Sequence, residues 1–412
     1  MIVAPSRGSR WGRRAVVALC VAAAASGSGL LYIRGGHVIR GTYVLNHGGR
    51  DFDVAAPPTE GACPAAKRPA CGPNDVCVKY LGAGGLYLEW QGSALLAGPF
   101  FSNESLLRVG LGKLRIDAAA IRQGLADVPI AKVRAVFAGH SHYDHIGDLP
   151  FVARQQTPQA RLLVNGSGAA ALAAYPELAA RVARIDVEPR EWIVVDGPAG
   201  RPIFRLWPIP SRHAPHFDHY TWGKGFDTKP WTTPWEAHAV DDLRDGGTWA
   251  FLIDLLDPTD GQSRFRMYYQ DSANDVGQGW PSAPGPQDEQ SVDLAVLCVA
   301  SHQYVTAAPE WILARAKPAH VMLAHWEDFF IPRTDPLRFV PLLSDDLVDT
   351  YLQRVRETLG ESGQRVRPPL DPVCGPSEPG FTWPLPGEWL RFRAVPNSQY
   401  TDSVPSGSTG AR

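Results

Sequence analysis

The sequence has almost no net charge. Its 40 lysines and arginines and 42 aspartates and glutamates leave a formal charge of −2 over 412 residues. Without a basic excess there is no electrostatic field to attract a phosphate backbone, so nucleic acid is excluded as a partner. No internal repeat is found in the sequence. The hydrophobic fraction of 44% is sufficient for one large core.

Cysteines are few, six in all, and none has the paired C-x-x-C spacing that is typical of a structural zinc site. Cys63, Cys71 and Cys77 crowd a segment rich in proline and glycine, and Cys374 lies in a proline-rich tail. In an oxidising compartment these four would form two disulfides, with three connectivities open. Cys298 lies within an apolar run and is expected to stay a free thiol.

Histidine is also scarce, with 12 residues in the whole chain, yet three of them fall in AGHSHYDHIGD at 138–148. On an extended segment, residues two apart point the same way, so His140 and His142 can share one ion. If a helix follows, Asp144 and His145 face a second point nearby. Imidazole and carboxylate ligands suit zinc or a similar divalent metal. A surface histidine cluster in a loop is the alternative.

The motif follows an apolar run at 132–139 that is typical of a buried strand. Three further runs of this kind lead to metal-ligand residues: 203–210 to His213, 265–270 to Asp271, and 320–324 to His325. Four strands that each end beside such a residue predict a site at one edge of a sheet, where a rigid scaffold holds the ligands.

With these residues the chain resembles the metallo-β-lactamase fold hydrolases. It is especially similar to the branch of L-ascorbate-6-phosphate lactonases and N-acylphosphatidylethanolamine-hydrolysing phospholipase D. The resemblance covers about residues 76 to 345 and implies an α/β fold, the four-layer αββα sandwich. It rests on these stretches: KYLGAGGLYLEW (79–90), H-x-H-x-D-H, IPSRH (209–213), QDS (270–272) and AHW (324–326). Two departures are Gly98-Pro99, where the family has Asp-Pro, and a long aromatic segment between His213 and Trp249.

The resemblance implies a centre of two divalent metal ions, zinc by preference, with manganese or iron as alternatives. His140, His142 and His213 would hold the first ion, and Asp144, His145 and His325 the second. Asp271 would bridge the two ions together with a water or hydroxide. Such a hydroxide attacks an ester-type bond (phosphodiester, lactone or acyl ester) without a serine or cysteine nucleophile. Asp144 and Asp271 are therefore expected to be catalytic as well as ligands.

Two other classes of function compete with this hydrolase. One is a redox member of the same fold, such as an iron-dependent dioxygenase. Members that use one iron tend to lose second-site ligands, whereas His145 and His325 are both present. The other is a non-catalytic binding protein, against which the complete ligand set argues. A β-lactamase is disfavoured because those enzymes lack a bridging aspartate equivalent to Asp271.

Further candidates lie near the expected ligands. His302 and Tyr304 follow the apolar run 294–300, so His302 is expected to be catalytic and Tyr304 to touch the substrate. A structural hydrogen bond is the alternative for both. In the segment after His213, the substrate would meet His216, Trp231 and Trp235. One hypothesis makes 216–235 an aromatic lid for a lipid-like or aryl substrate. The alternative is a fixed loop whose tryptophans pack on the domain.

The first residues predict export. Arg7, Arg10, Arg13 and Arg14 precede an apolar stretch, 15–25, that is followed by small residues. A cleaved signal peptide would place the protein in the periplasm or outside the cell. An uncleaved anchor, which would associate the protein with the membrane, is the alternative.

The expected organisation is as follows: a signal or anchor at 1–33, a linker with a cysteine loop at 34–75, the catalytic domain at 76–360, and a proline-rich extension at 361–412. A helix is predicted at 345–359. Residues 365–396 are expected to wrap extended over the surface, burying Phe381, Trp383, Trp389 and Phe392. The last dozen residues have the composition of a disordered tail.

Overall fold

The computed structural model describes residues 68–394, except 189, 283–284, 289, 362–370, 373–376 and 379. The predicted signal or anchor, most of the linker and the last residues of the tail lie outside this range. Within it, two eight-stranded sheets form the centre of the molecule. Among the described residues, no helix is long and apolar enough to cross a membrane.

The first sheet has the strand order β13-β16-β1-β2-β3-β4-β5-β6. Its strands β16, β1, β2 and β3 pair antiparallel, whereas β3 to β6 are parallel. The strand bounds are β1 Asp75–Gly82, β2 Gly85–Trp90, β3 Ser93–Ala97, β4 Val133–Phe137, β5 Arg161–Val164, β6 Val182–Arg184, β13 Asp371–Pro372 and β16 Trp389–Arg393.

The second sheet has the order β14-β15-β12-β11-β10-β9-β8-β7. Strands β7 to β10 pair antiparallel, and β10, β11, β12 and β15 are parallel. The bounds are β7 Ile193–Asp196, β8 Pro202–Ser211, β9 Thr248–Leu256, β10 Ser263–Tyr269, β11 Leu294–Cys298, β12 His320–Ala324, β14 Ser377–Glu378 and β15 Phe381–Thr382.

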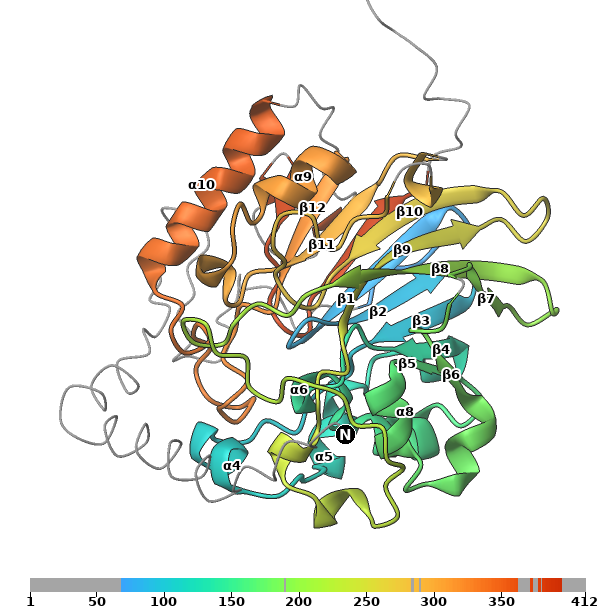
Figure 1. The fold of residues 1–412 in the computed structure, drawn as a ribbon. Coiled ribbons are helices and arrows are strands. Elements are labelled where there is room, and N and C mark those ends of the chain that lie inside the picture. The colour runs from blue at the N-terminus through green and yellow to red at the C-terminus, as the bar shows by residue number, and fades with distance from the viewer. Residues whose placement is uncertain are drawn as a thin grey trace, which may run out of the picture.

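Helices cover the outer face of each sheet (Figure 1). The first sheet carries α4 Leu106–Leu111, α5 Ala118–Gly124, α6 Tyr143–Ile146, α7 Leu149–Phe151 and α8 Gly166–Leu172. The second sheet carries α9 Glu310–Ala316 and α10 Asp345–Glu361. The order of layers is therefore helix, sheet, sheet, helix, and the predicted four-layer αββα sandwich is confirmed.

The period-two pattern of β1 shows why the sheets stack. Val76, Val78 and Tyr80 belong to the apolar cluster between the two sheets, whereas Cys77 and Leu81 belong to the cluster under the first-sheet helices. Because successive side chains of a strand point to opposite faces, a strand that is apolar on both faces must be covered on both. All eight residues of β1 are buried.

The strands that were predicted from apolar runs are confirmed. They are β4 before the motif, β8 before His213, β10 before Asp271 and β12 before His325. Strand β11 precedes His302, β9 contains Trp249, and α10 covers the predicted helix.

The C-terminal segment departs from the prediction. It was expected to wrap extended over the surface, but β16 pairs with β1 in the first sheet, and β15 pairs with β12 in the second. Trp389 is 0% exposed. Phe381, Trp389 and Phe392 are buried, as predicted. They are buried inside the layers of the sandwich and not on its surface. The sheet edge at β1 supplies the hydrogen bonds that an extended surface segment would lack.

One predicted disulfide falls within the described residues and joins Cys71 to Cys77. Among the three connectivities left open, the one that contains Cys71–Cys77 would pair Cys63 with Cys374. Both of these cysteines lie outside the described residues, as does Cys20. Cys298 is buried and carries a free thiol, as predicted.

Candidate metal centre

The structure brings together all seven side chains that the sequence predicted as metal ligands. They form three overlapping groups, in each of which the ligand atoms lie within 4.8 Å of one another. The groups are His140, His142 and His213; His140, His145 and Asp271; and Asp144, His145 and His325. These residues follow β4, β8, β10 and β12, so they meet at one edge of the sandwich.

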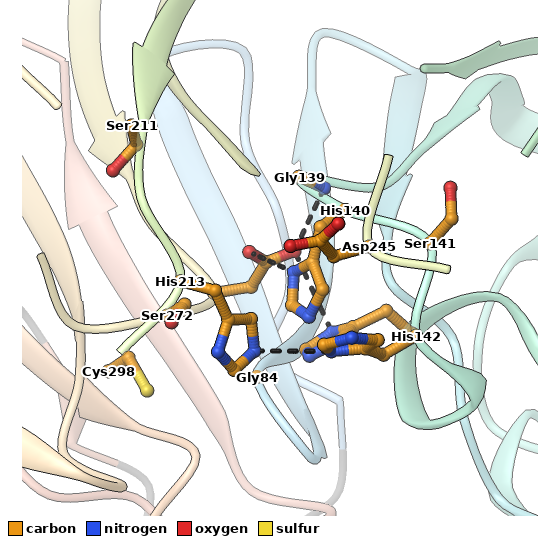
Figure 2. A network of polar contacts seen from close by, with 12 residues as sticks. Gly84, Gly139, His140, Ser141, His142, Ser211, His213, Asp245, Ser272 and Cys298 are labelled. Carbon is orange, nitrogen blue, oxygen red and sulfur yellow. Dashed lines mark hydrogen bonds and ion pairs between the residues drawn. The ribbon is translucent and has the colours of Figure 1, made fainter. Parts of the chain in front are cut away.

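The first group is a triad of imidazoles (Figure 2). The ring centroids of His140, His142 and His213 lie 4.6 to 4.7 Å apart, and Nδ1 of His142 lies 3.2 Å from Nε2 of His213. Nδ1 of His213 donates to the Ala214 carbonyl, which leaves its Nε2 as a lone pair directed at His142. Two ligands at about 2.0–2.1 Å from one tetrahedral zinc ion lie about 3.3 Å apart, so this separation fits a shared ion.

The second group has the same spacing. One oxygen of Asp144, Oδ2, lies 3.4 Å from Nε2 of His145 and 3.3 Å from Nε2 of His325. His142 immediately precedes α6, whose first turn carries Asp144 and His145. The change from extended to helical backbone therefore separates the two pairs of ligands within the motif, as the sequence predicted.

Asp271 lies between the two groups. Its Oδ1 is 3.0 Å from Nδ1 of His140, and its Oδ2 is 3.6 Å from Nδ1 of His145. The N–H of Gly139 donates to Oδ2 at 2.8 Å and orients the carboxylate. A Cβ on Gly139 would lie 2.5 Å from Oδ1 of Asp271, so only glycine lets the backbone approach this closely.

Metal binding requires neutral imidazoles and ionised carboxylates, and His140, His142, His145 and Asp144 are shifted towards these states. Burial lowers the pKa of His140 and His142 well below the usual value, and that of His145 to about 3. Burial alone would raise the pKa of Asp144, but His145 and His325 hold it well below its usual range. Two groups are shifted the other way: burial raises the pKa of Asp271, and Asp144 raises the pKa of His325 although burial alone would lower it. Binding of cations at the cluster would favour the ionised carboxylate and the neutral imidazole at these two positions.

Several buried nitrogen atoms of the centre have no hydrogen-bond partner: Nε2 of His140, Nε2 of His142 and both ring nitrogens of His145. A buried polar atom without a partner is costly, and most such atoms in proteins are paired. Neutral imidazoles and carboxylates at ligand-to-ligand spacing are a donor set that fits divalent metal ions. The seven residues of the three groups would hold these metal ions.

A supporting contact that the sequence did not predict fixes the backbone at His325. Its φ is +56°, a left-handed conformation that is uncommon outside glycine. The His325 N–H donates to the Tyr80 hydroxyl at 2.7 Å, and that hydroxyl donates to Oε2 of Glu327 at 2.5 Å. The other oxygen of Glu327 accepts the N–H of Ala83. Tyr80 lies within KYLGAGG and Glu327 directly follows AHW, two of the stretches on which the family resemblance rests.

His216 lies at the rim of the centre. Its ring stacks on that of His213 with centroids 4.6 Å apart and an interplanar angle of 24°, and lies 5.4 Å from that of His142. The residue is exposed. A contact between His216 and the substrate therefore stays a prediction.

His302 and Tyr304 are not brought to the centre by any contact among the described residues. The His302 ring is buried and lies 4.7 Å from that of Tyr351 in α10, so it packs under the outer helix. The pattern of an apolar strand followed by histidine is the same as for His325, but a short helix, His302–Tyr304, follows β11, and the His302 ring meets α10 instead of the ligands. The expected catalytic role of His302 has no support in this geometry.

Trp231 and Trp235 do not line the centre either. They are 7% and 0% exposed and belong to the apolar cluster under the first-sheet helices. The Trp231 N–H donates to Ala170 of α8, and its ring stacks 3.6 Å from that of His238. The lid hypothesis is wrong for these two residues, and the alternative of tryptophans packed on the domain is what the structure shows.

No protein-family model matches the chain, and no curated protein matches it. Among solved structures, a metallo-hydrolase from Ignicoccus hospitalis is similar over 77% of this chain and 99% of its own, at 16% identity and a TM-score of 0.42. A metallo-β-lactamase fold protein from Bacillus subtilis is similar over 77% and 99%, at 12% identity and a TM-score of 0.38.

A diiron β-hydroxylase from Streptomyces venezuelae is similar over 70% of this chain and 52% of its own, at 13% identity and a TM-score of 0.41. At these low identities and TM-scores, none of the three structures indicates which reaction this chain carries out, and only the geometry of its own side chains bears on that question.

Proposed function

We propose that this chain is an exported, metal-dependent hydrolase that cleaves an ester-type bond of a small or lipid-like molecule at a centre of two metal ions. The observation that carries the proposal is the position of Asp271, which contacts ligands of both groups in one buried cluster. When bound, two divalent ions would activate a water near neutral pH and neutralise the negative charge that develops on the substrate.

The side chains set the charge of the centre. Asp144 and Asp271 offset part of the positive charge of two dications and leave an excess that attracts an electron-rich phosphoryl or carbonyl oxygen. As metal ligands, the five histidines would be neutral and would add no charge. Asp271 is held by Gly139 and His140, so it does not reorganise when the substrate binds.

The hydroxyl and thiol groups near the cluster have other tasks, which supports water as the nucleophile. The Ser141 hydroxyl donates to Asn165, and the Ser272 hydroxyl accepts the N–H of Ala214. Burial raises the pKa of the Cys298 thiol, so it is not a thiolate at neutral pH. None of these three is arranged as an activated nucleophile beside a base.

Elemental analysis of the purified protein tests the metal centre. We expect two transition-metal ions per chain, with zinc as the preferred ion and iron as the one that would favour redox chemistry. Asp271→Ala should lose metal and turnover, whereas Asp260→Ala, a substitution of an exposed aspartate at the opposite end of β10, should retain both. One ion per chain at saturation would contradict the two-metal centre.

A hydrolysis screen of zinc- and manganese-loaded protein against phosphodiesters, lactones and acyl esters tests the reaction. Turnover that disappears with Asp271→Ala and persists with Asp260→Ala supports the proposal. If two ions are bound but none of the three panels is cleaved, the hydrolase assignment is wrong and the metal centre stands.

A further inference from the structure

The chain forms a tight turn immediately after Ala214 and Pro215. The N–H groups of His216 and Phe217 both donate to the Tyr220 carbonyl, and the Tyr220 N–H donates back to the Phe217 carbonyl. Asp218 has a φ of +50° at the tip. The Trp222 N–H donates to Nδ1 of His216 at 3.0 Å and closes the base. Residues 216–222, called the aromatic turn below, are thus fixed by their own backbone.

Both ends of the aromatic turn lie against the first group of ligands. At one end, the His216 ring stacks on His213. Just beyond the other end, a Cβ on Gly223 would lie 3.1 Å from the His142 ring, and the Gly223 carbonyl accepts the N–H of Asp245. The aromatic turn therefore runs along the rim of the centre from His213 to His142.

The aromatic side chains of this turn are unlike the tryptophans that follow them. Phe217 is 59% exposed and Tyr220 is 56% exposed, whereas Trp231 and Trp235 are buried in the outer layer. The Tyr220 ring meets only the edge of Trp222, with centroids 6.4 Å apart. Two large rings, in a turn whose ends lie against the ligands, thus leave most of their surface open to another apolar group, whose burial would be favourable.

We propose that the aromatic turn is the subsite for the apolar group of the substrate, an aryl ring or an acyl chain, and that Phe217 and Tyr220 set this specificity. The inference rests on the proposed function, because the reacting bond would lie at the metal ligands. His216 then stands between the two parts of the substrate, with its ring fixed by Trp222 and His213.

Phosphonates provide the test, because they bind metal centres and are not hydrolysed. The affinities of methylphosphonate, phenylphosphonate and octylphosphonate are measured by calorimetry on the metal-loaded protein. We expect phenyl- or octylphosphonate to bind on the order of tenfold more tightly than methylphosphonate. Phe217→Ser/Tyr220→Ser should abolish that gain and leave methylphosphonate unaffected. The matched control is Val187→Ser/Val194→Ser, which replaces two exposed apolar residues elsewhere.

The size of the gain separates the two substrate types: a larger gain for octylphosphonate assigns an acyl chain, and a larger gain for phenylphosphonate an aryl ring. A gain that survives in Phe217→Ser/Tyr220→Ser, or no gain in the wild type, overturns the subsite. If no phosphonate binds, the proposed function fails instead. The turn is then judged by fluorescence titration of metal-free protein with 2-naphthol, which should bind the wild type and not the variant.

Discussion

Tyr80 controls the backbone of His325 from a distance of 245 residues in the chain. Its hydroxyl satisfies the N–H of a histidine in the left-handed region, a conformation that costs about 1–3 kcal/mol and persists only when its surroundings hold it. Glu327 in turn holds the hydroxyl and the N–H of Ala83. The second group of ligands therefore depends on a contact between the two sheets.

Tyr80→Phe should weaken the second group and spare the first. Loss of the hydroxyl leaves the His325 N–H unpaired, and loss of such a supporting contact lowers metal affinity by about 10–100-fold. Titration against a chelator measures the two affinities separately. Tyr268→Phe is the control, because its hydroxyl binds Gly279 and Gln270 outside the centre. Equal weakening of both ions in Tyr80→Phe would contradict this role.

His302 should affect the pH dependence of stability. Burial, followed by the nearby charge of Arg354, lowers the pKa of His302 from 6.5 to about 4. As the pH falls, the unfolded chain takes up the proton first, so the free energy of unfolding decreases between pH 6.5 and 4. His302→Phe removes this contribution, about 3 kcal/mol for a shift of this size.

Urea unfolding of wild type and His302→Phe between pH 7 and pH 4 measures how the His302 pKa shift contributes to the free energy of unfolding. The difference between the two proteins should change in favour of the variant as the pH falls, because the other titrating groups cancel. Metal content should stay the same in both. A difference that does not depend on pH would show that the ring titrates normally.

The ligands could be predicted from the sequence because each ligand cluster follows an apolar run, and a run that ends at a polar residue marks a sheet edge. His302 shows the limit of this reasoning. It also follows an apolar run, but the run does not determine which way the chain turns after β11. Tyr80 and Glu327 could not be found because their contact depends on how two sheets stack, which no local pattern encodes.

At the scale of elements, the segment between His213 and Trp249 divides into two parts. The aromatic turn presents its rings to solvent, and the part around Trp231 packs under the first-sheet helices. Aromatic content alone predicts either arrangement, since tryptophans pack in a core as readily as they line a pocket. In the structure, the backbone N–H of Trp231 donates to the Ala170 carbonyl of α8, and this contact holds the tryptophan part of the segment against the helix layer.

Trp231→Ala should therefore destabilise the fold by about 3 kcal/mol, because it removes a buried ring that stacks on His238 and contacts Trp235 at a tilt. The kcat/KM of the folded protein should change little for any substrate. Phe226→Ala, at a ring that is 71% exposed in the same segment, is the control and should leave the melting temperature unchanged. A raised KM for apolar substrates with unchanged stability would restore the lid hypothesis.

At the scale of the whole molecule, the last described strands complete both sheets. The C-terminal segment supplies β15 to the second sheet and β16 to the first. Trp389 in β16 meets Tyr87 edge to face with centroids 5.6 Å apart, and its Nε1 donates to Asp127 at 2.9 Å. The proline content of this segment predicted an extension, but strand pairing needs only short runs such as WLRFR.

Trp389→Ala should cost about 3–5 kcal/mol, because a fully buried indole is removed from the layer under the first sheet. Trp389→Phe should cost less, since it keeps an apolar ring and loses only the bond to Asp127. Urea unfolding followed by circular dichroism measures both. Equal stability of wild type and Trp389→Ala would mean that β16 is dispensable.

The pairing of β16 with β1 has a consequence for the order of events during synthesis. β1 is the first described strand to leave the ribosome, and its edge stays open until residues 389–393 have also emerged. An unpaired strand edge recruits other strands, so this interval is when the nascent chain is most exposed to aggregation.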